Sequence, residues 1–131
     1  MGKKAVIAVI NYDGLILIGK KRSKSPKVLA GEWHVLGEGV EKGESDKSAL
    51  ERCAREEAGI VELRVGKYIG SHKTPTSGRT ARWYECFAYN DHVKAGSDLE
   101  EVKWVPKQAV LNICRSRVSS WPKAVQNYFG R

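Results

Sequence analysis

"GEGVEKGESDKSALERCAREEAGI", residues 37–60, is the stretch of this chain that decides its fold. Its second half predicts a helix from about Ser45 to Ala58, and Gly59 follows in the position where a left-handed residue usually ends a helix. At about 100° per residue, one apolar stripe runs along this helix. The stripe consists of Ala49, Leu50, Cys53 and Ala54.

Two acids lie on or beside that stripe. Glu57 falls in its middle, and Glu56 falls at its edge on the same side as Arg52. A buried carboxylate is costly unless it is paired or binds a metal, and two adjacent carboxylates also repel each other. A divalent cation such as Mg²⁺ removes both penalties. The alternative is that Glu57 extends past the helix end into solvent, while Arg52 pairs with Glu56 one turn away.

The residues before the helix favour the metal. Gly37, Gly39 and Gly43 predict a glycine-rich turn whose backbone carbonyls and amides can approach an ion or a phosphate closely. Glu44, at the end of this turn, can meet Arg52 and fix the turn against the helix. The stretch therefore predicts a cradle for Mg²⁺-pyrophosphate chemistry.

At these residues the sequence resembles the Nudix hydrolase family, whose box is G-x5-E-x7-R-E-U-x-E-E-x-G-U, where U is a bulky aliphatic residue. Six positions match: Glu44, Arg52, Glu56, Glu57, Gly59 and Ile60. Upstream, "WHVLGE" resembles the family pattern W-x-L-P-G-G, with Trp33 and Gly37 kept. The resemblance implies a Nudix-type α/β/α sandwich with a central mixed sheet.

The resemblance also implies roles for these residues. Glu44, Arg52, Glu56 and Glu57 are the expected catalytic residues. Gly37, through its carbonyl, Glu56 and Glu57 would hold Mg²⁺ or Mn²⁺, and a metal-bound water would attack phosphorus. Related enzymes often take a further acid from a late loop. The segment "SDLEEVKW" contains Asp98, Glu100 and Glu101. The family resemblance, an acid shortly before a strand that ends in tryptophan, favours Glu101, unless the segment is only a solvated turn.

Three positions depart from the family pattern. Glu38 replaces the first glycine of the box, Leu36 replaces a proline, and Cys53 replaces a glutamate that binds metal or acts as a base in the family. Cys53 is either a soft-metal or redox-sensitive thiol or a small filler of the core. Glu38 or Glu41 could compensate for the missing acid, so weak activity is expected rather than none.

Four residues are candidate substrate-binding groups: Arg22, Trp33, Arg79 and Arg82. The resemblance implies that Arg22, at the end of the second strand, faces the phosphates. Trp33 either stacks on a nucleobase or belongs to the core. The arginines, with His72, either contact phosphate or base, or are solvated.

The rest of the chain predicts one domain over residues 1–131, with a mixed sheet between helices. "NYDG" marks a hairpin between two strands that are buried on both faces. Later strands are expected at "EWHVL", "IVELRVGKYIGSH", "RTARWYECFAYN" and "EVKWVP". A short helix is expected after Pro106, and a last helix in "SSWPKAVQNYF", capped by Ser119 or Ser120.

The composition indicates which kinds of partner and which cell compartment to expect. The 23 Lys and Arg exceed the 15 Asp and Glu, giving a formal charge of +8, which either favours nucleotides or RNA or only keeps the protein soluble. Without a signal pattern or a long apolar run, we expect a cytoplasmic protein with no membrane contact, as a monomer or a homodimer. Three scattered cysteines indicate neither disulfides nor zinc.

Two functions remain open from the sequence. The first is a metal-dependent hydrolase of the pyrophosphate bond in a nucleoside diphosphate linked to another moiety. The second is a weak or inactive module that binds nucleotide or RNA, for which Cys53, Glu38 and the positive charge are the support. A purely structural or interaction role is the remaining alternative.

Overall fold

The computed structural model describes residues 3–22, 31–75 and 78–130. Within these ranges, one mixed six-stranded sheet has the order β4-β5-β1-β3-β2-β6, with β1 and β5 parallel and the other neighbours antiparallel. The strands are β1 (Lys4–Tyr12), β2 (Leu15–Lys21), β3 (Trp33–Gly39), β4 (Leu63–Lys73), β5 (Thr80–Ala88) and β6 (Leu99–Pro106).

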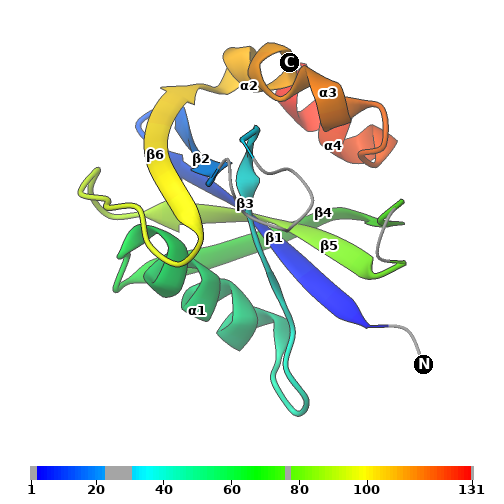
Figure 1. The fold of residues 1–131 in the computed structure, drawn as a ribbon, viewed down its shortest axis with the longest axis horizontal. Coiled ribbons are helices and arrows are strands. Elements are labelled where there is room, and N and C mark those ends of the chain that lie inside the picture. The colour runs from blue at the N-terminus through cyan, green and yellow to red at the C-terminus, as the bar shows by residue number, and fades with distance from the viewer. Residues whose placement is uncertain (1–2, 23–30, 76–77, 131) are drawn as a thin grey trace.

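Helices cover both faces of this sheet (Figure 1). α1 (Asp46–Ala58) packs on one face, and the short C-terminal helices pack on the other. These are η1 (Lys107–Ala109), α2 (Val110–Ile113), α3 (Arg115–Val118) and α4 (Lys123–Phe129). The predicted α/β/α sandwich with a mixed sheet is confirmed.

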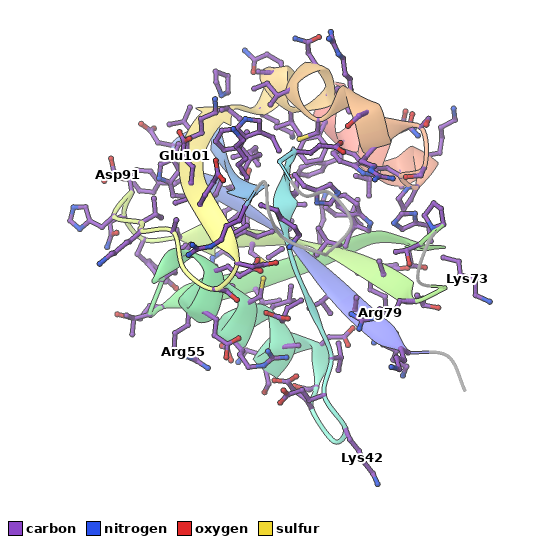
Figure 2. All side chains as sticks on the ribbon, viewed as in Figure 1. Lys42, Arg55, Lys73, Arg79, Asp91 and Glu101 are labelled. Carbon is purple, nitrogen blue, oxygen red and sulfur yellow. The ribbon has the colours of Figure 1, made fainter. Side chains whose placement is uncertain are left out.

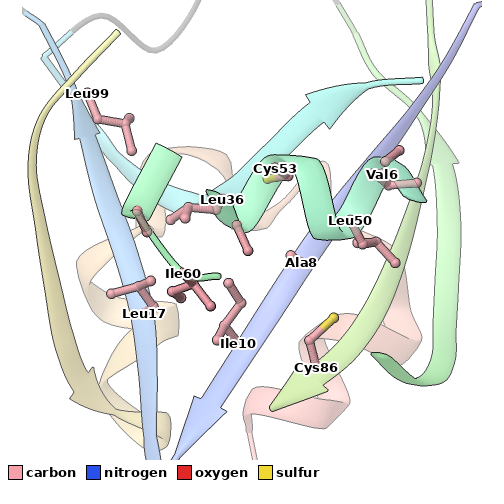
Figure 3. Close-up of a cluster of buried hydrophobic side chains, with 13 residues drawn as sticks. Val6, Ala8, Ile10, Leu17, Leu36, Leu50, Cys53, Ile60, Cys86 and Leu99 are labelled. Atoms are coloured by element: carbon pink, nitrogen blue, oxygen red, sulfur yellow. The ribbon is translucent and has the colours of Figure 1, made fainter. Parts of the chain in front are cut away.

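The core is divided by the sheet, because side chains alternate along each strand. Val6, Ala8 and Ile10 of β1 pack with Leu50 and Cys53 of α1 (Figure 3). Val9 points to the other face, where it joins a cluster that contains Trp83 of β5 and Phe129 of α4. The first two strands are therefore buried on both sides, as their sequence predicts.

The first hairpin turns at Asp13 and Gly14, whose φ angles of 51° and 79° are both positive. Such angles are typical of the tight hairpin turn that an Asp-Gly pair predicts. β1 and β2 pair directly at only two positions, beside this turn. Beyond them the strands separate, and β3 pairs with both.

α1 begins and ends where the sequence predicts. The Ser45 hydroxyl accepts a hydrogen bond from the Ser48 N–H at 3.1 Å, which satisfies one of the free amides at the helix start. At the other end, Gly59 has a φ of 70°, and its N–H is bonded to carbonyls of the last turn.

Two local expectations are corrected. Gly37 and Gly39 do not lie in a turn, because β3 continues to Gly39 and pairs with Ala5 of β1; of the three glycines, only Gly43 turns the chain, at a φ of 78°. The last helix, α4, begins after Pro122 and has no side-chain cap. The sequence also contains a basic run, "GKKRSKSPK" at residues 19–27, of which residues 23–27 lie outside the described residues. No described helix has the length and apolar character that crossing a membrane requires.

Candidate active site

Arg52 connects α1, β3 and the loop between them. Its Nε and Nη2 atoms donate to the two carboxylate oxygens of Glu44, both at 2.9 Å, and Nη2 also donates to the Gly39 carbonyl at 2.7 Å. This pairing lowers the pKa of Glu44 to about 2. The predicted Glu44–Arg52 pair is therefore present, and it fixes the β3–α1 loop against the helix.

Glu56 lies at the edge of this arrangement. Its Oε1 is 3.3 Å from Nη1 of Arg52, and its side chain is 46% exposed. Glu38, on β3, lies nearby, with Oε2 3.8 Å from the same Nη1 atom. Arg52 thus contacts three carboxylates. Oε1 of Glu38 also accepts a hydrogen bond from the Gly39 N–H at 3.3 Å, so Glu56 is the carboxylate of the three that is most open to another cation.

Glu57 is buried, with only 4% of its surface exposed. Burial raises the pKa of its carboxyl group to about 7, and the nearby carboxylates of Glu38 and Asp98 add to this rise. Lys21 and the Cys53 thiol oppose it. The alternative in which Glu57 extends into solvent is therefore wrong.

Cys53 is completely buried in the cluster under α1. Burial, together with the charge of Glu57, raises the pKa of its thiol well above the usual value. The protonated thiol donates to Oε1 of Glu57 at 3.7 Å. This environment favours a core filler over a soft-metal ligand, because metals bind the thiolate.

Lys21 and Asp98 complete the surroundings of Glu57. The Nζ atom of Lys21 lies 3.3 Å from Oδ2 of Asp98, although 77 positions separate the two residues. Side chains two or four residues apart on a strand point to the same face, so Lys21 shares a face of β2 with Leu17, which packs under α1. This alternation in the sequence could therefore have predicted that Lys21 lies on the α1 side. No comparable signal singles out Asp98, because its position depends on the pairing of β2 with β6.

Glu101 does not join this group in the described structure. It is exposed and lies opposite Lys20 in the strand register. Figure 2 shows Glu101 on β6. Of the late-loop acids, Asp98 is the one whose charge acts on Glu57. The expectation of a late acid is therefore better met by Asp98 than by Glu101.

The four predicted substrate-binding residues lie in different surroundings. Arg22 is exposed after β2, and Trp33 packs at the edge of the second core cluster with Nζ of Lys103 4.4 Å from its ring centre. Arg79 lies beside the start of β1 (Figure 2), close to Gly39. The sequence proposed these side chains for one substrate site, whereas in the folded sheet they come from different strands and have different neighbours.

Arg82 lies under the start of α1. Its Nε and Nη2 donate to the two oxygens of Asp46, at 2.6 and 2.5 Å, and Tyr84 donates to the same carboxylate at 2.5 Å. These bonds hold the pKa of Asp46 below its usual range. The geometry assigns Arg82 to anchoring the helix rather than to an open substrate site.

A cavity of about 240 Å³ begins beside Glu57. Glu57, Lys21, Leu36 and Gly37 line it near α1. Four rings of the opposite layer also line it: His34, His72, Trp83 and Trp121. An acidic centre thus adjoins an aromatic cavity, which can take a flat apolar group attached to a charged one.

The carboxylates fit a hard divalent cation. In the described part of the chain, no three His, Cys, Asp or Glu side chains are arranged to hold a metal by themselves. Mg²⁺ commonly uses only one or two carboxylates, and takes water and substrate phosphates as its other ligands. A cation would also relieve the repulsion of Glu57 by Glu38 and Asp98.

Comparisons with known proteins point to one family. A family model described as NUDIX domain matches residues 2–122. The chain is 43% identical over 76 residues to the CTP pyrophosphohydrolase of Escherichia coli, and the match spans 58% of this chain but only 54% of that protein. It is 29% identical over 119 residues to the nucleoside triphosphatase NudI of E. coli, covering 82% and 84% of the two chains.

A solved structure shows the same fold over nearly the whole chain. The MutT protein from Methanosarcina mazei Go1 superposes with a TM-score of 0.73 at 22% sequence identity. The superposition covers 97% of this chain and 89% of that one. The family model includes the entire stretch 37–60 from which the site was inferred.

Proposed function

This chain belongs to the Nudix family, and we propose that it is a divalent-metal-dependent hydrolase that cleaves the pyrophosphate bond of a nucleotide. One observation carries the proposal: the buried Glu57 carboxyl, its pKa raised to about 7, lines the cavity that also holds four aromatic rings. A raised carboxylate pKa in a cavity is typical of functional sites.

The residues that would hold the metal are Glu57, Glu56 and the carbonyl of Gly37, with Asp98 as the late-loop acid. Mg²⁺ or Mn²⁺, when bound, supplies charge neutralisation of the phosphates and activation of water. Lys21 lies on the same side of the cavity and binds a phosphate oxygen. Glu44 and Arg52 hold Gly39 and α1 in fixed positions, so the residues that would bind the metal stay aligned.

The reaction needs one proton acceptor. Water adds to phosphorus, the bond from that phosphorus to the bridging oxygen breaks, and the bridging oxygen leaves with the other product. Cys53 is unsuited to accept the proton of the water, because its thiol is buried and keeps its own proton. Glu38 is the carboxylate beside Glu57 that is partly exposed, so we assign it this role.

Nucleoside triphosphates are the first substrates to test. The related proteins of known name are a CTP pyrophosphohydrolase and a nucleoside triphosphatase. The cavity places aromatic rings next to the acidic centre, as a nucleoside attached to a phosphate chain requires. In this arrangement the base lies among the rings and the phosphates lie beside Lys21 and Glu57.

A second candidate function is nucleotide binding without efficient hydrolysis. Cys53 supports it, because a protonated thiol stands where the family has a carboxylate. The +8 charge fits anionic ligands in either case. RNA is a possible ligand of such a module, and its binding would weaken steeply with salt.

The test is hydrolysis of a nucleotide panel (triphosphates, sugar diphosphates and dinucleoside polyphosphates) with Mg²⁺ or Mn²⁺. The native protein is compared with Glu57→Gln and with Glu51→Gln, a control on the solvent side of α1. Turnover that Glu57→Gln abolishes and Glu51→Gln keeps supports the hydrolase. Nucleotide binding without turnover would favour the binding module.

A further inference from the structure

The aromatic part of the cavity contains two histidines beside two tryptophans. The ring centres of His34 and His72 each lie 6.1 Å from that of Trp83, and His34 lies 5.5 Å from Trp121. The two tryptophan centres are 4.8 Å apart. The four rings come from β3, β4, β5 and the segment before α4, so they meet only in the folded chain.

Hydrogen bonds fix which nitrogen of each histidine carries the proton. Nδ1 of His34 is 2.6 Å from the Val35 carbonyl, and Nδ1 of His72 is 2.5 Å from the Ser120 carbonyl. A carbonyl oxygen only accepts, so each Nδ1 must donate. Burial lowers the pKa of His34 to about 4 and lowers that of His72, so both rings are neutral at pH 7.

Each Nε2 atom is therefore an acceptor. Among the residues that the structure describes, none donates a hydrogen bond to Nε2 of His34 or of His72. Both histidines line the same cavity, so two acceptors without a partner among the described residues are open to one ligand that carries two N–H donors. The Nε1–H of Trp83, which also lacks a partner in the described set, is fully buried and does not face this space.

Nucleobases differ in how many N–H groups they offer to such acceptors. In a nucleoside, cytosine and adenine each carry an amino group with two N–H donors beside a ring-nitrogen acceptor, and guanine carries three donors. Uracil and thymine carry a single N–H. Two Nε2 acceptors are therefore satisfied by an amino-bearing base, whereas uracil leaves one of them unpaired.

We propose that His34 and His72 select a nucleobase that carries an exocyclic amino group, whose N–H groups donate to the two Nε2 atoms. This inference rests on the proposed function, because it assigns the aromatic part of the cavity to the base of the nucleotide. Uridine nucleotides bind more weakly because one acceptor stays unpaired, and not because of their size.

The test compares CMP with UMP, which have the same charge and nearly the same shape and contain no bond for the enzyme to cleave. Binding is followed by tryptophan fluorescence, since Trp83 and Trp121 line the cavity. We expect CMP to bind on the order of tenfold to a hundredfold more tightly than UMP. Equal binding, stronger binding of UMP, or no binding of either would overturn the proposal.

Variants separate selection from folding. His34→Phe keeps a ring but removes the acceptor, so the CMP preference should fall severalfold, and His34→Gln, which returns an acceptor, should restore part of it. His72→Phe gives a second, independent loss. His92→Phe, in an exposed loop, is the control and should leave the preference unchanged. A preference that survives both His34→Phe and His72→Phe would contradict the assignment.

Measuring both binding and hydrolysis on the native protein distinguishes this inference from the proposed function. A CMP preference in a native protein that hydrolyses no nucleotide would support the selection of the base and rule out the hydrolase. Turnover of CTP and UTP with equal kcat/KM would support the hydrolase and remove the selection.

Discussion

The Sγ atom of Cys53 donates a hydrogen bond to Oε1 of Glu57, 3.7 Å away and one turn further along α1. In the Nudix box this position carries a second acid, so a neutral donor has replaced a charge next to the buried carboxyl. The thiol stabilises the ionised form of Glu57, while burial opposes it more strongly. The site therefore holds less negative charge than the box resemblance implies.

Restoring the acid should strengthen metal binding and catalysis. We expect Cys53→Glu to raise kcat/KM by about tenfold or more, because a positioned acid or base typically contributes at least that much. Without metal, the variant should be less stable, since a second buried carboxyl has no partner. Thermal unfolding with and without Mg²⁺ measures this, and Mg²⁺ should raise the Tm more than in the native protein.

Cys53→Gln is the matched control for that experiment. It has the size of glutamate but no charge, so it should show neither the gain in kcat/KM nor the larger effect of Mg²⁺ on Tm. An equal gain in kcat/KM in both variants would mean that the change in packing, and not the added charge, causes the gain.

The pKa of Glu57 predicts how stability depends on pH in the absence of metal. Its folded pKa of about 7 lies above the ordinary value of 4.5, so the protonated form is favoured by folding. This contribution is complete below pH 4.5 and is lost as pH rises through 7, a change of about 3 kcal/mol in the free energy of unfolding.

Urea unfolding in EDTA measures this loss. Glu57→Gln cannot ionise, so its stability relative to the native protein should increase by about 3 kcal/mol between pH 4.5 and pH 8. Glu51→Gln, on the exposed face of α1, should run parallel to the native protein. Parallel curves for Glu57→Gln and the native protein would mean that Glu57 titrates normally.

Arg52→Lys tests the connection between the loop and α1. Lysine cannot form the double bond to Glu44 and at the same time reach the Gly39 carbonyl, because it lacks the planar guanidinium group. We expect a lower Tm and a fall of about tenfold in kcat/KM through loss of alignment. Arg55→Lys, on the exposed side of the helix, should change neither.

Arg82→Leu distinguishes an anchor from a substrate-binding residue. The variant removes the two bonds to Asp46, so the free energy of unfolding should fall by about 2 kcal/mol while KM for nucleotides stays unchanged. A double-mutant cycle with Asp46→Asn, measured by urea unfolding, should show that the two losses are not additive. A large rise in KM with little loss of stability would instead place Arg82 at the substrate.

Local patterns in the sequence determined α1 and the first hairpin, and they placed Glu57 on the apolar stripe of α1 while leaving its burial open. Ser45, Gly59 and the Asp13–Gly14 pair act on their immediate neighbours, so short-range geometry fixes the helix ends and the turn. The 3.6-residue period alone turns Glu57 toward the core. The Glu44–Arg52 pair was also predictable, because both residues lie within the same box.

Only the tertiary structure decided which distant residues complete the site. Lys21 reaches Asp98, His72 reaches Ser120, and Arg82 reaches Asp46, contacts that span 77, 48 and 36 positions of the chain. Each depends on strand order and register, which no local pattern encodes. For the same reason Glu101 lies elsewhere than expected, and the two histidine acceptors come to one cavity only because β3, β4 and β5 meet around it.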